Sequence, residues 1–319
     1  MAKTIAIFGA SGQIGRVVTE SLLAAGHTVT ALEHTRPVPA GCKVVKGTVS
    51  DFDAVRQTIA ENEIVLQLAT TKSDRATFMD VAVRGTFHIL DAIMQRGGCE
   101  QFVLAGGDCS VGIWYYRNPK PITEDTPLRA YPGYYALSKV LEETLVEQFG
   151  HQCGLPWTIL RMGWVNTPAM LVKLFLCGNA GCPPGKVWRN MFRGEMPPEL
   201  QKRVDGDGPG FVMVAVDQQG KLPIRRTTVS FADVASAWTL AVGNPLARNQ
   251  VFNVVSPAWD YGVVGEWLAG KLNVPAERVP LDAHSWDMDT TKIRTMLGWQ
   301  PRDDVFGMLE RGLAELRGA

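Results

Sequence analysis

Residues 3–15 read Lys-Thr-Ile-Ala-Ile-Phe-Gly9-Ala-Ser-Gly12-Gln-Ile-Gly15, and this stretch decides the fold. The β-branched and apolar run over residues 3–8 is typical of a strand that is buried on both faces. Residues 13–25 follow with apolar side chains at helical spacing, and Gly26 stands where a helix-terminating glycine belongs. The stretch therefore predicts a strand, a glycine loop and a helix.

The same alternation continues outward from this unit. Further strands are predicted over residues 28–32, 44–45, 64–68, 101–105 and 157–161, and helices over 51–60, 75–95 and 133–149. Strands that alternate with helices at this pitch indicate an α/β protein of the Rossmann type, a doubly wound parallel sheet covered by helices on both sides.

The alternation is lost after residue 165, in a stretch rich in glycine and proline, and returns with a helix over 233–242 and a strand over 251–255. We therefore expect a dinucleotide-binding domain over 1–165 plus about 228–256. The remainder, about 166–227 plus 257–319, is expected to form a smaller, irregular α/β region that binds the substrate.

Composition narrows the class of protein. The 319 residues carry 32 basic and 32 acidic side chains, so no net positive field attracts nucleic acid. No apolar run approaches the roughly 20 residues that span a bilayer. Six cysteines form no CxxC pair, which argues against a disulfide framework and a zinc site, so we expect no metal. The glycine loop begins within ten residues of Met1, which favours a cytoplasmic protein without a leader.

The glycine loop itself predicts a dinucleotide site. Gly9 permits a sharp turn, Gly12 lets the backbone approach a pyrophosphate, and Gly15 lets helix and strand pack closely. Ser11, Gln13 and Ile14 complete the loop at the helix N-terminus.

Glu33 ends the second predicted strand, where a carboxylate can accept hydrogen bonds from the adenosine ribose and repel a 2′-phosphate. NAD is therefore expected, with NADP less favoured. The simpler interpretation of Glu33 is an exposed residue at a strand end.

Tyr135 and Lys139 lie four residues apart, on one face of the predicted helix. A free phenol is a poor base at neutral pH, but a nearby ammonium favours the phenolate and lowers the phenol pKa. Tyr135 could then exchange a proton with a substrate oxygen while Lys139 activates it and bonds the nicotinamide ribose. Two surface residues at chance spacing are the alternative.

Together, Gly9 to Gly15 and the segment Pro132-Gly-Tyr-Tyr135-Ala-Leu-Ser-Lys139 resemble the extended short-chain dehydrogenase/reductase family, in its NAD-dependent epimerase/dehydratase group. Matches at residues 121–127, 159–161, 229–235 and 289–301 extend the resemblance over nearly the whole chain. The resemblance implies an enzyme of the Rossmann fold, a homodimer, and Asp233 as a helix N-cap. It also implies further cofactor contacts, namely Val49, Leu68, Ala69 and Thr70.

The chain departs from the family at the reacting oxygen. Gly107 occupies the position of the usual Ser or Thr hydroxyl, and loss of one such donor costs about 3 kcal/mol in transition-state stabilisation. Asp108 and Ser110 are the nearest candidates to replace it. For Asp108, a capping role in the loop is an equally weighted alternative.

The diphosphate grip of nucleotide-sugar members is incomplete in this sequence. Trp164 takes the place of an Asn, while Arg226 matches one of the paired arginines, so both are candidate substrate-binding residues. Aromatic residues nearby favour a flatter, more apolar substrate pocket.

Three functions remain open from the sequence. The first is an NAD-dependent oxidoreductase or epimerase that acts on a hydroxyl or carbonyl carbon of a sugar-like or other small polar or aromatic substrate. The second is a dinucleotide-binding sensor or scaffold that has lost turnover, and the third is a redox-neutral lyase or isomerase that uses Asp108.

Overall fold

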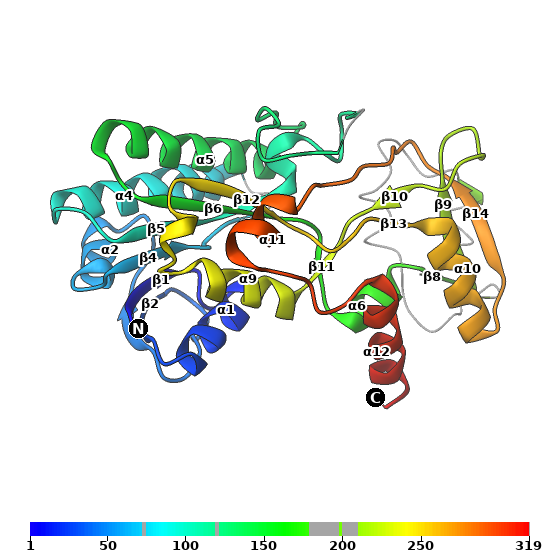
Figure 1. The fold of residues 1–319 in the computed structure, drawn as a ribbon, viewed down its shortest axis with the longest axis horizontal. Helices are drawn as coiled ribbons and strands as arrows, with labels where there is room; N and C mark the ends of the chain where they lie inside the picture. Colours follow the sequence, from blue (N-terminus) through cyan, green and yellow to red (C-terminus); the bar gives the residue numbers. More distant parts are fainter. Residues whose placement is uncertain (72–74, 119–120, 179–197, 200–209, 319) are drawn as a thin grey trace.

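The computed structural model describes residues 1–71, 75–118, 121–178, 198–199 and 210–318. A seven-stranded sheet forms its centre, in the order β12-β6-β5-β4-β1-β2-β3, and every neighbouring pair is parallel (Figure 1). The predicted doubly wound sheet is thereby confirmed. The strands are β1 (Thr4–Phe8), β2 (Thr28–Glu33), β3 (Lys43–Lys46), β4 (Ile64–Gln67), β5 (Gln101–Gly107), β6 (Trp157–Met162) and β12 (Gln250–Val254).

Helices cover both faces of this sheet (Figure 1). On one face lie α1 (Gln13–Ala24), α9 (Phe231–Ala241) and α11 (Thr291–Leu297), and on the other α2 (Phe52–Ile59), α4 (Gly85–Gln95) and α5 (Tyr134–Cys153). Because side chains alternate along a strand, Ile5 and Ile7 of β1 pack toward the first group, whereas Ala6 and Phe8 pack toward the second. All four are fully buried, as the apolar run predicted.

The predicted helix over 75–95 is interrupted. It consists of α3 (Arg75–Thr77), a π-helical stretch η1 (Phe78–Arg84), and then α4. Gly85 starts α4 against the loop after β3, where an added Cβ would lie 2.6 Å from Cγ2 of Val49. A glycine is therefore needed for this close approach.

The N-cap assignment for α9 was wrong. Ser230, not Asp233, is the N-cap, because its backbone is extended and its hydroxyl accepts a hydrogen bond from the Asp233 N–H at 3.0 Å. Asp233 stands three residues into the motif, where its carboxylate accepts from the Ser230 hydroxyl at 2.7 Å and from the Arg302 N–H at 2.8 Å. The arrangement differs from a capping box, in which the acidic side chain would accept from the backbone N–H of the N-cap residue.

A second, smaller group of strands and helices has its own apolar cluster. Its strands β8 (Leu176–Cys177), β9 (Phe211–Val216) and β14 (Ala276–Pro280) form one sheet in the order β14-β9-β8. Helix α10 (Tyr261–Leu272) shares its apolar cluster with α6 (Pro168–Lys173) and α12 (Val305–Arg317). Short strand pairs join β7 (Val165–Asn166) to β11 (Val229–Ser230), and β10 (Arg225–Arg226) to β13 (Trp259–Asp260). The domain boundaries themselves stay a prediction, and α11 of the C-terminal segment packs with the large sheet.

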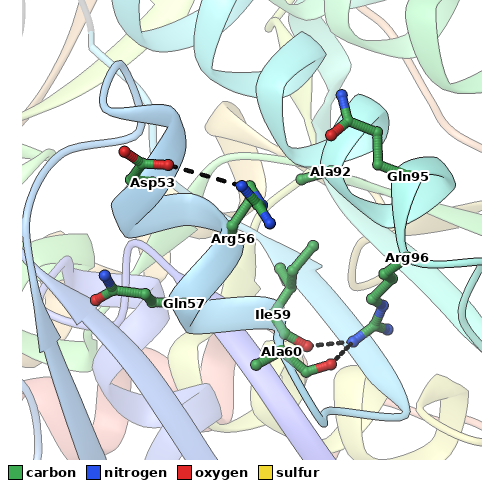
Figure 2. Close-up of a pocket in the computed structure, with 8 residues that line it drawn as sticks. All are labelled: Asp53, Arg56, Gln57, Ile59, Ala60, Ala92, Gln95 and Arg96. Atoms are coloured by element: carbon green, nitrogen blue, oxygen red, sulfur yellow. Dashed lines mark hydrogen bonds and ion pairs between the residues drawn. The ribbon is translucent and has the colours of Figure 1, made fainter.

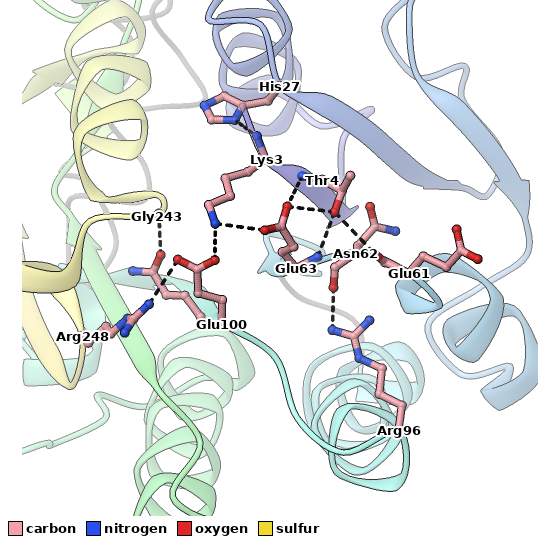
Figure 3. A network of polar contacts seen from close by, with 11 residues as sticks. Lys3, Thr4, His27, Glu61, Asn62, Glu63, Arg96, Glu100, Gly243 and Arg248 are labelled. Atoms are coloured by element: carbon pink, nitrogen blue, oxygen red, sulfur yellow. Dashed lines mark hydrogen bonds and ion pairs between the residues drawn. The ribbon is translucent and has the colours of Figure 1, made fainter. Parts of the chain in front are cut away.

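The amino edge of the large sheet is closed by a polar network (Figure 3). Lys3, next to β1, pairs with Glu63 before β4 and with Glu100 before β5. Glu100 in turn pairs with Arg248, next to β12, at 3.1 Å. Each partly exposed pair contributes little alone, but the set joins the ends of four strands. The network lies only at the amino ends of the strands, so the loops at the opposite, carboxyl edge are available to form a binding site.

Candidate active site

The candidate site lies at the carboxyl edge of the sheet, around β1. Strand β1 has β2 on one side and β4 on the other, so the chain order reverses there. Ligands of open α/β sheets bind in the crevice outside such a point. The segments that follow β1, β2, β3, β4 and β5 carry most of the site residues expected from the sequence, and α5 carries Tyr135 and Lys139.

The glycine loop packs without space for side chains. Gly9 has a φ of +91°, and an added Cβ there would lie 2.5 Å from the backbone nitrogen of Ala69 and 2.6 Å from the carbonyl carbon of Leu68. A Cβ on Gly15 would lie 2.0 Å from the Gly9 carbonyl oxygen. The structure thus brings the loops after β1 and β4 into contact, and Thr70 follows directly in the second loop.

The start of α1 fits an anionic ligand. Gly12 is its N-cap, with an extended backbone and no side-chain hydrogen bond to the helix. A Cβ on Gly12 would meet only the Gly9 carbonyl oxygen, at 3.3 Å. The unpaired N–H groups of a first turn, together with the helix dipole, attract a phosphate. Ser11, Gln13 and Ile14 lie at this turn.

Glu33 is held in place at the end of β2. Its carboxylate pairs with Lys46 and accepts a hydrogen bond from the Val38 N–H at 3.0 Å. Hydrogen bonding by Lys46 and Val38 lowers the pKa of Glu33, so the carboxylate is ionised at neutral pH. Val49 is buried nearby and packs against Gly85.

Tyr135 and Lys139 both lie in the first turns of α5. The Lys139 ammonium is buried, donates to the Ala105 carbonyl oxygen of β5 at 2.9 Å, and lies 2.8 Å from Oε2 of Glu142. Lys139 is thus an anchored cation below the end of β5.

The expected acidification of Tyr135 is not found in the structure. Burial raises the pKa of the Tyr135 phenol well above its ordinary value, and Cys109, Asp108 and Glu142 raise it further. Desolvation and nearby acidic groups both disfavour a phenolate. The direction is opposite to the expected one chiefly because burial disfavours the charged phenolate.

Gly107 ends β5 with an extended backbone, and the 3₁₀ turn η2 (Asp108–Val111) follows. Asp108 is 8% exposed, and burial raises its pKa to about 7, against the opposing hydrogen bonds of the Trp114 indole and the Cys109 N–H. Its Oδ2 has no hydrogen-bond partner among the described residues. Ser110 is fully buried and donates to the Gly107 carbonyl oxygen at 2.9 Å.

Trp164 and Arg226 meet in an aromatic cluster. The Trp114 ring contacts Trp164 at 5.5 Å and Trp286 at 4.6 Å between ring centroids. The Arg226 guanidinium lies 3.7 Å from the centroid of Trp286, and its Nη1 donates to the carbonyl oxygens of Arg225 and His284. At 1% exposure, Arg226 is a buried member of this cluster.

Sequence reasoning missed two residues near Tyr135, Cys109 and Glu142. Cys109 is buried, and its Sγ lies where a side chain on Gly107 would point. Its place two residues after the missing hydroxyl was the available signal. Glu142 is buried, and its spacing of three residues from Lys139 was a sign of an ion pair on one helix face.

A surface hollow lies away from this site, between α2 and α4 (Figure 2). There the Arg96 guanidinium donates to the carbonyl oxygens of Ile59 and Ala60, at the end of α2. It therefore caps a helix. Among the described residues no group of three potential metal ligands occurs, and no helix is long and apolar enough to cross a membrane.

Among curated proteins, the chain has relatives that are named as sugar-converting enzymes. The chain is 25% identical to a UDP-glucose 4-epimerase of Lactobacillus helveticus, over 94% of both chains. It is 28% identical to an L-arabinose 1-dehydrogenase (NAD(P)(+)) of Haloferax volcanii, over 51% of this chain and 67% of the relative.

Solved structures share the whole fold. A short-chain dehydrogenase/reductase superfamily protein of Agrobacterium tumefaciens, with bound NAD, has a TM-score of 0.85 at 24% identity, covering 99% of this chain and 97% of its own. A UDP-glucose 4-epimerase of Thermotoga maritima has a TM-score of 0.72 at 18% identity, covering 99% of both chains. The family model described as the NAD dependent epimerase/dehydratase family matches residues 5–169. The chain therefore belongs to the NAD-dependent epimerase/dehydratase family, within the extended short-chain dehydrogenases/reductases.

Proposed function

We propose that this protein is an NAD-dependent oxidoreductase or epimerase that acts on a hydroxyl or carbonyl carbon of a sugar-like or other small polar or aromatic substrate. The observation that carries the proposal is the convergence of a glycine cradle, an anchored lysine and a buried tyrosine at one edge of the sheet. Each group belongs to a different step, namely cofactor binding, charge placement and proton exchange.

The cradle fits a dinucleotide. Gly12 leaves the start of α1 uncovered by a side chain, and the pyrophosphate would bind there. Leu68, Ala69 and Thr70 would border the nicotinamide half. Val49 would contact the adenine ring, and Glu33 would accept hydrogen bonds from the adenosine ribose. The ionised Glu33 repels a 2′-phosphate, so NAD is favoured over NADP.

When bound, the nicotinamide supplies or accepts the hydride. Tyr135 would hold the proton that moves to or from the substrate oxygen at its phenol oxygen. Lys139 has three N–H donors. Glu142 and Ala105 take two of them, and the third would bond the nicotinamide ribose.

Asp108 would supply the hydrogen bond that a Ser or Thr at position 107 would give. A buried carboxyl group with a pKa of about 7 is substantially protonated near neutrality, and a protonated carboxyl group donates. Ser110 would support Asp108 from the same turn. The same observation favours a second candidate, a redox-neutral lyase or isomerase in which Asp108 is the main base.

Trp164 would present an aromatic face to the substrate, and Arg226 would shape the same wall. Because relatives are named for activity on UDP-glucose and on L-arabinose, these sugars are the first substrates to test. We further propose a homodimer, since Met79, Phe87 and Leu137 are exposed apolar side chains on η1, α4 and α5. The five described cysteines are free, in keeping with the proposed cytoplasmic location.

Calorimetry with NAD and NADP, followed by turnover of L-arabinose, D-galactose and UDP-glucose, tests this function. Nicotinamide absorbance reports net oxidation, and product chromatography reports epimerisation. Tyr135→Phe should abolish turnover but retain NAD binding, while Tyr134→Phe, at the exposed neighbouring tyrosine, should retain both. Turnover that survives Tyr135→Phe and stops in Asp108→Asn would assign the lyase or isomerase. Tight NAD binding without turnover on any substrate would assign the sensor.

A further inference from the structure

Helix α5 carries two adjacent carboxylates that are both buried and bound to different cations. Glu142 lies one turn beyond Lys139, with 2.8 Å between its Oε2 and the Lys139 Nζ. Glu143 lies 2.9 Å from Nε of Arg161, on β6. Both carboxylates have fully buried side chains. Glu142 contacts Lys139 of the candidate active site, whereas Glu143 contacts Arg161 and the hydroxyl of Ser110.

The Lys139 ion pair fixes the position of the ammonium. Nζ is held from two sides, by Glu142 on its own helix and by the Ala105 carbonyl oxygen on β5 at 2.9 Å. A buried cation is costly unless a counter-charge and hydrogen bonds satisfy it. Glu142 is the carboxylate that supplies the counter-charge, so the depth and place of Lys139 depend on it.

The same pair limits the effect of Lys139 on the phenol. A cation and an anion 2.8 Å apart act on a third group as a dipole, whose field falls off faster than that of a lone charge. In agreement, burial is the largest cause of the raised pKa of Tyr135, and Glu142 is among the groups that raise it further. Burial also raises the pKa of Glu142 itself, against Lys139 and the Thr86 hydroxyl of α4.

Other charged and titratable groups surround this pair. Facing Tyr135 are Asp108 and Cys109 of η2 and Tyr131 of the segment before α5. Glu143 faces Glu142 on the same helix and is itself neutralised by Arg161 of β6. On η1, Asp80 and Arg84 pair with each other at 3.1 Å and are about half exposed. Among these groups, Glu142 is the one in direct contact with Lys139.

We propose that Glu142 is a positioning residue of this active site, which anchors the Lys139 ammonium below β5, balances its charge, and so determines how strongly Lys139 acts on Tyr135. The inference rests on the proposed function, because it assumes that Tyr135 exchanges the proton and Lys139 assists it. It adds Glu142 to the two residues, Tyr135 and Lys139, on which the proposed function depends.

The test compares Glu142→Gln with Glu143→Gln in the NAD-loaded protein, using the substrate that turns over fastest among L-arabinose, D-galactose and UDP-glucose. Both changes remove one buried charge from the same helix, so both should lower thermal stability. Glu142→Gln alone should move the midpoint of the turnover pH profile to lower pH by about one unit, a tenfold change in the phenolate ratio. The pH dependence of NAD affinity should move in the same direction and needs no substrate.

Glu142→Asp keeps the charge and should hold the midpoint close to that of the parent, which distinguishes charge from packing. If Glu142→Gln does not fold, Glu142→Asp still decides. The shorter side chain loosens the contact with Nζ, so NAD affinity should fall at least about threefold.

The inference would be overturned if the two Gln variants lost equal stability while the midpoint of the pH profile stayed that of the parent. If Glu142→Gln does not fold, full NAD affinity in Glu142→Asp would overturn it instead. Tyr135→Phe is measured in parallel. If it retains turnover, the proposed function fails. If it loses turnover while Glu142→Gln keeps the parent pH profile, only the role of Glu142 fails.

Discussion

The Sγ atom of Cys109 lies 3.2 Å from the position that a Cβ atom would take on Gly107. The thiol therefore borders the space into which the usual hydroxyl-bearing side chain would project. The other atoms around this Cβ position lie farther away, and the nearest of them is the Met162 carbonyl oxygen at 3.9 Å. The size of the side chain at position 107 is therefore coupled to that at position 109, because the Cys109 thiol borders the space beside Gly107.

Restoring the hydroxyl should require both positions to change. Gly107→Ser alone crowds Cys109 and should cost about 1–3 kcal/mol of stability, as overpacking does. In the Cys109→Ala background the same serine has space, so the cost should fall below about 1 kcal/mol. Denaturant unfolding of the two single variants and the double variant measures the coupling. Strictly additive losses would show that the two side chains do not compete for this space.

Substitutions at two of the loop glycines, Gly15 and Gly12, should separate folding from cofactor binding. Gly15→Ala places a methyl group on the Gly9 carbonyl oxygen and should unfold or severely destabilise the protein. Gly12→Ala meets the same oxygen at 3.3 Å, so the fold should survive while NAD affinity falls at least about tenfold. Melting temperature and calorimetric NAD titration distinguish the two. Unchanged NAD affinity in Gly12→Ala would contradict the phosphate cradle.

Asp108 should make stability depend on pH. Its folded pKa of about 7 lies above the ordinary 3.8, so the folded state holds the proton more tightly. The stability that this adds is complete below pH 4 and is lost as pH rises through 7, about 4 kcal/mol at most. Asp108→Asn should flatten the unfolding free energy over this range. A slope identical to that of the parent would show that Asp108 titrates normally.

Glu33 should set the choice between NAD and NADP. Replacing its ionised carboxylate in Glu33→Gln removes the repulsion of a 2′-phosphate, so the NAD to NADP affinity ratio should fall about tenfold. Glu20→Gln, on an exposed part of α1, serves as the control for loss of one negative charge. Equal ratios in both variants would exclude Glu33 from ribose recognition.

Arg226 should contribute to stability through its stacking. Arg226→Lys loses the planar contact with Trp286 and the Nη1 group that donates to two carbonyl oxygens, at an expected cost of about 2–4 kcal/mol. The adjacent Arg225→Lys is the control, since Arg225 is half exposed and pairs loosely with Asp287 at 3.6 Å, and should change stability by less than about 0.5 kcal/mol. Similar losses at both positions would contradict this role.

Local patterns were sufficient for most of the architecture. The strands and helices of the large sheet follow the predicted ranges closely, because apolar runs and helical spacing within ten or twenty residues already decide them. Even so, the π-helical η1 and the capping role of Ser230 were missed, since each depends on backbone geometry that residue types only bias.

By itself, the sequence determined the parallel sheet, the glycine cradle and the family, because these depend on spacing along the chain. Tertiary structure decided the electrostatics of the site. Glu142 balances Lys139, burial raises the pKa of Tyr135 and Asp108, and Arg226 stacks on Trp286, sixty residues away. Desolvation and through-space charge depend on which groups the fold brings together and how completely it removes water from them.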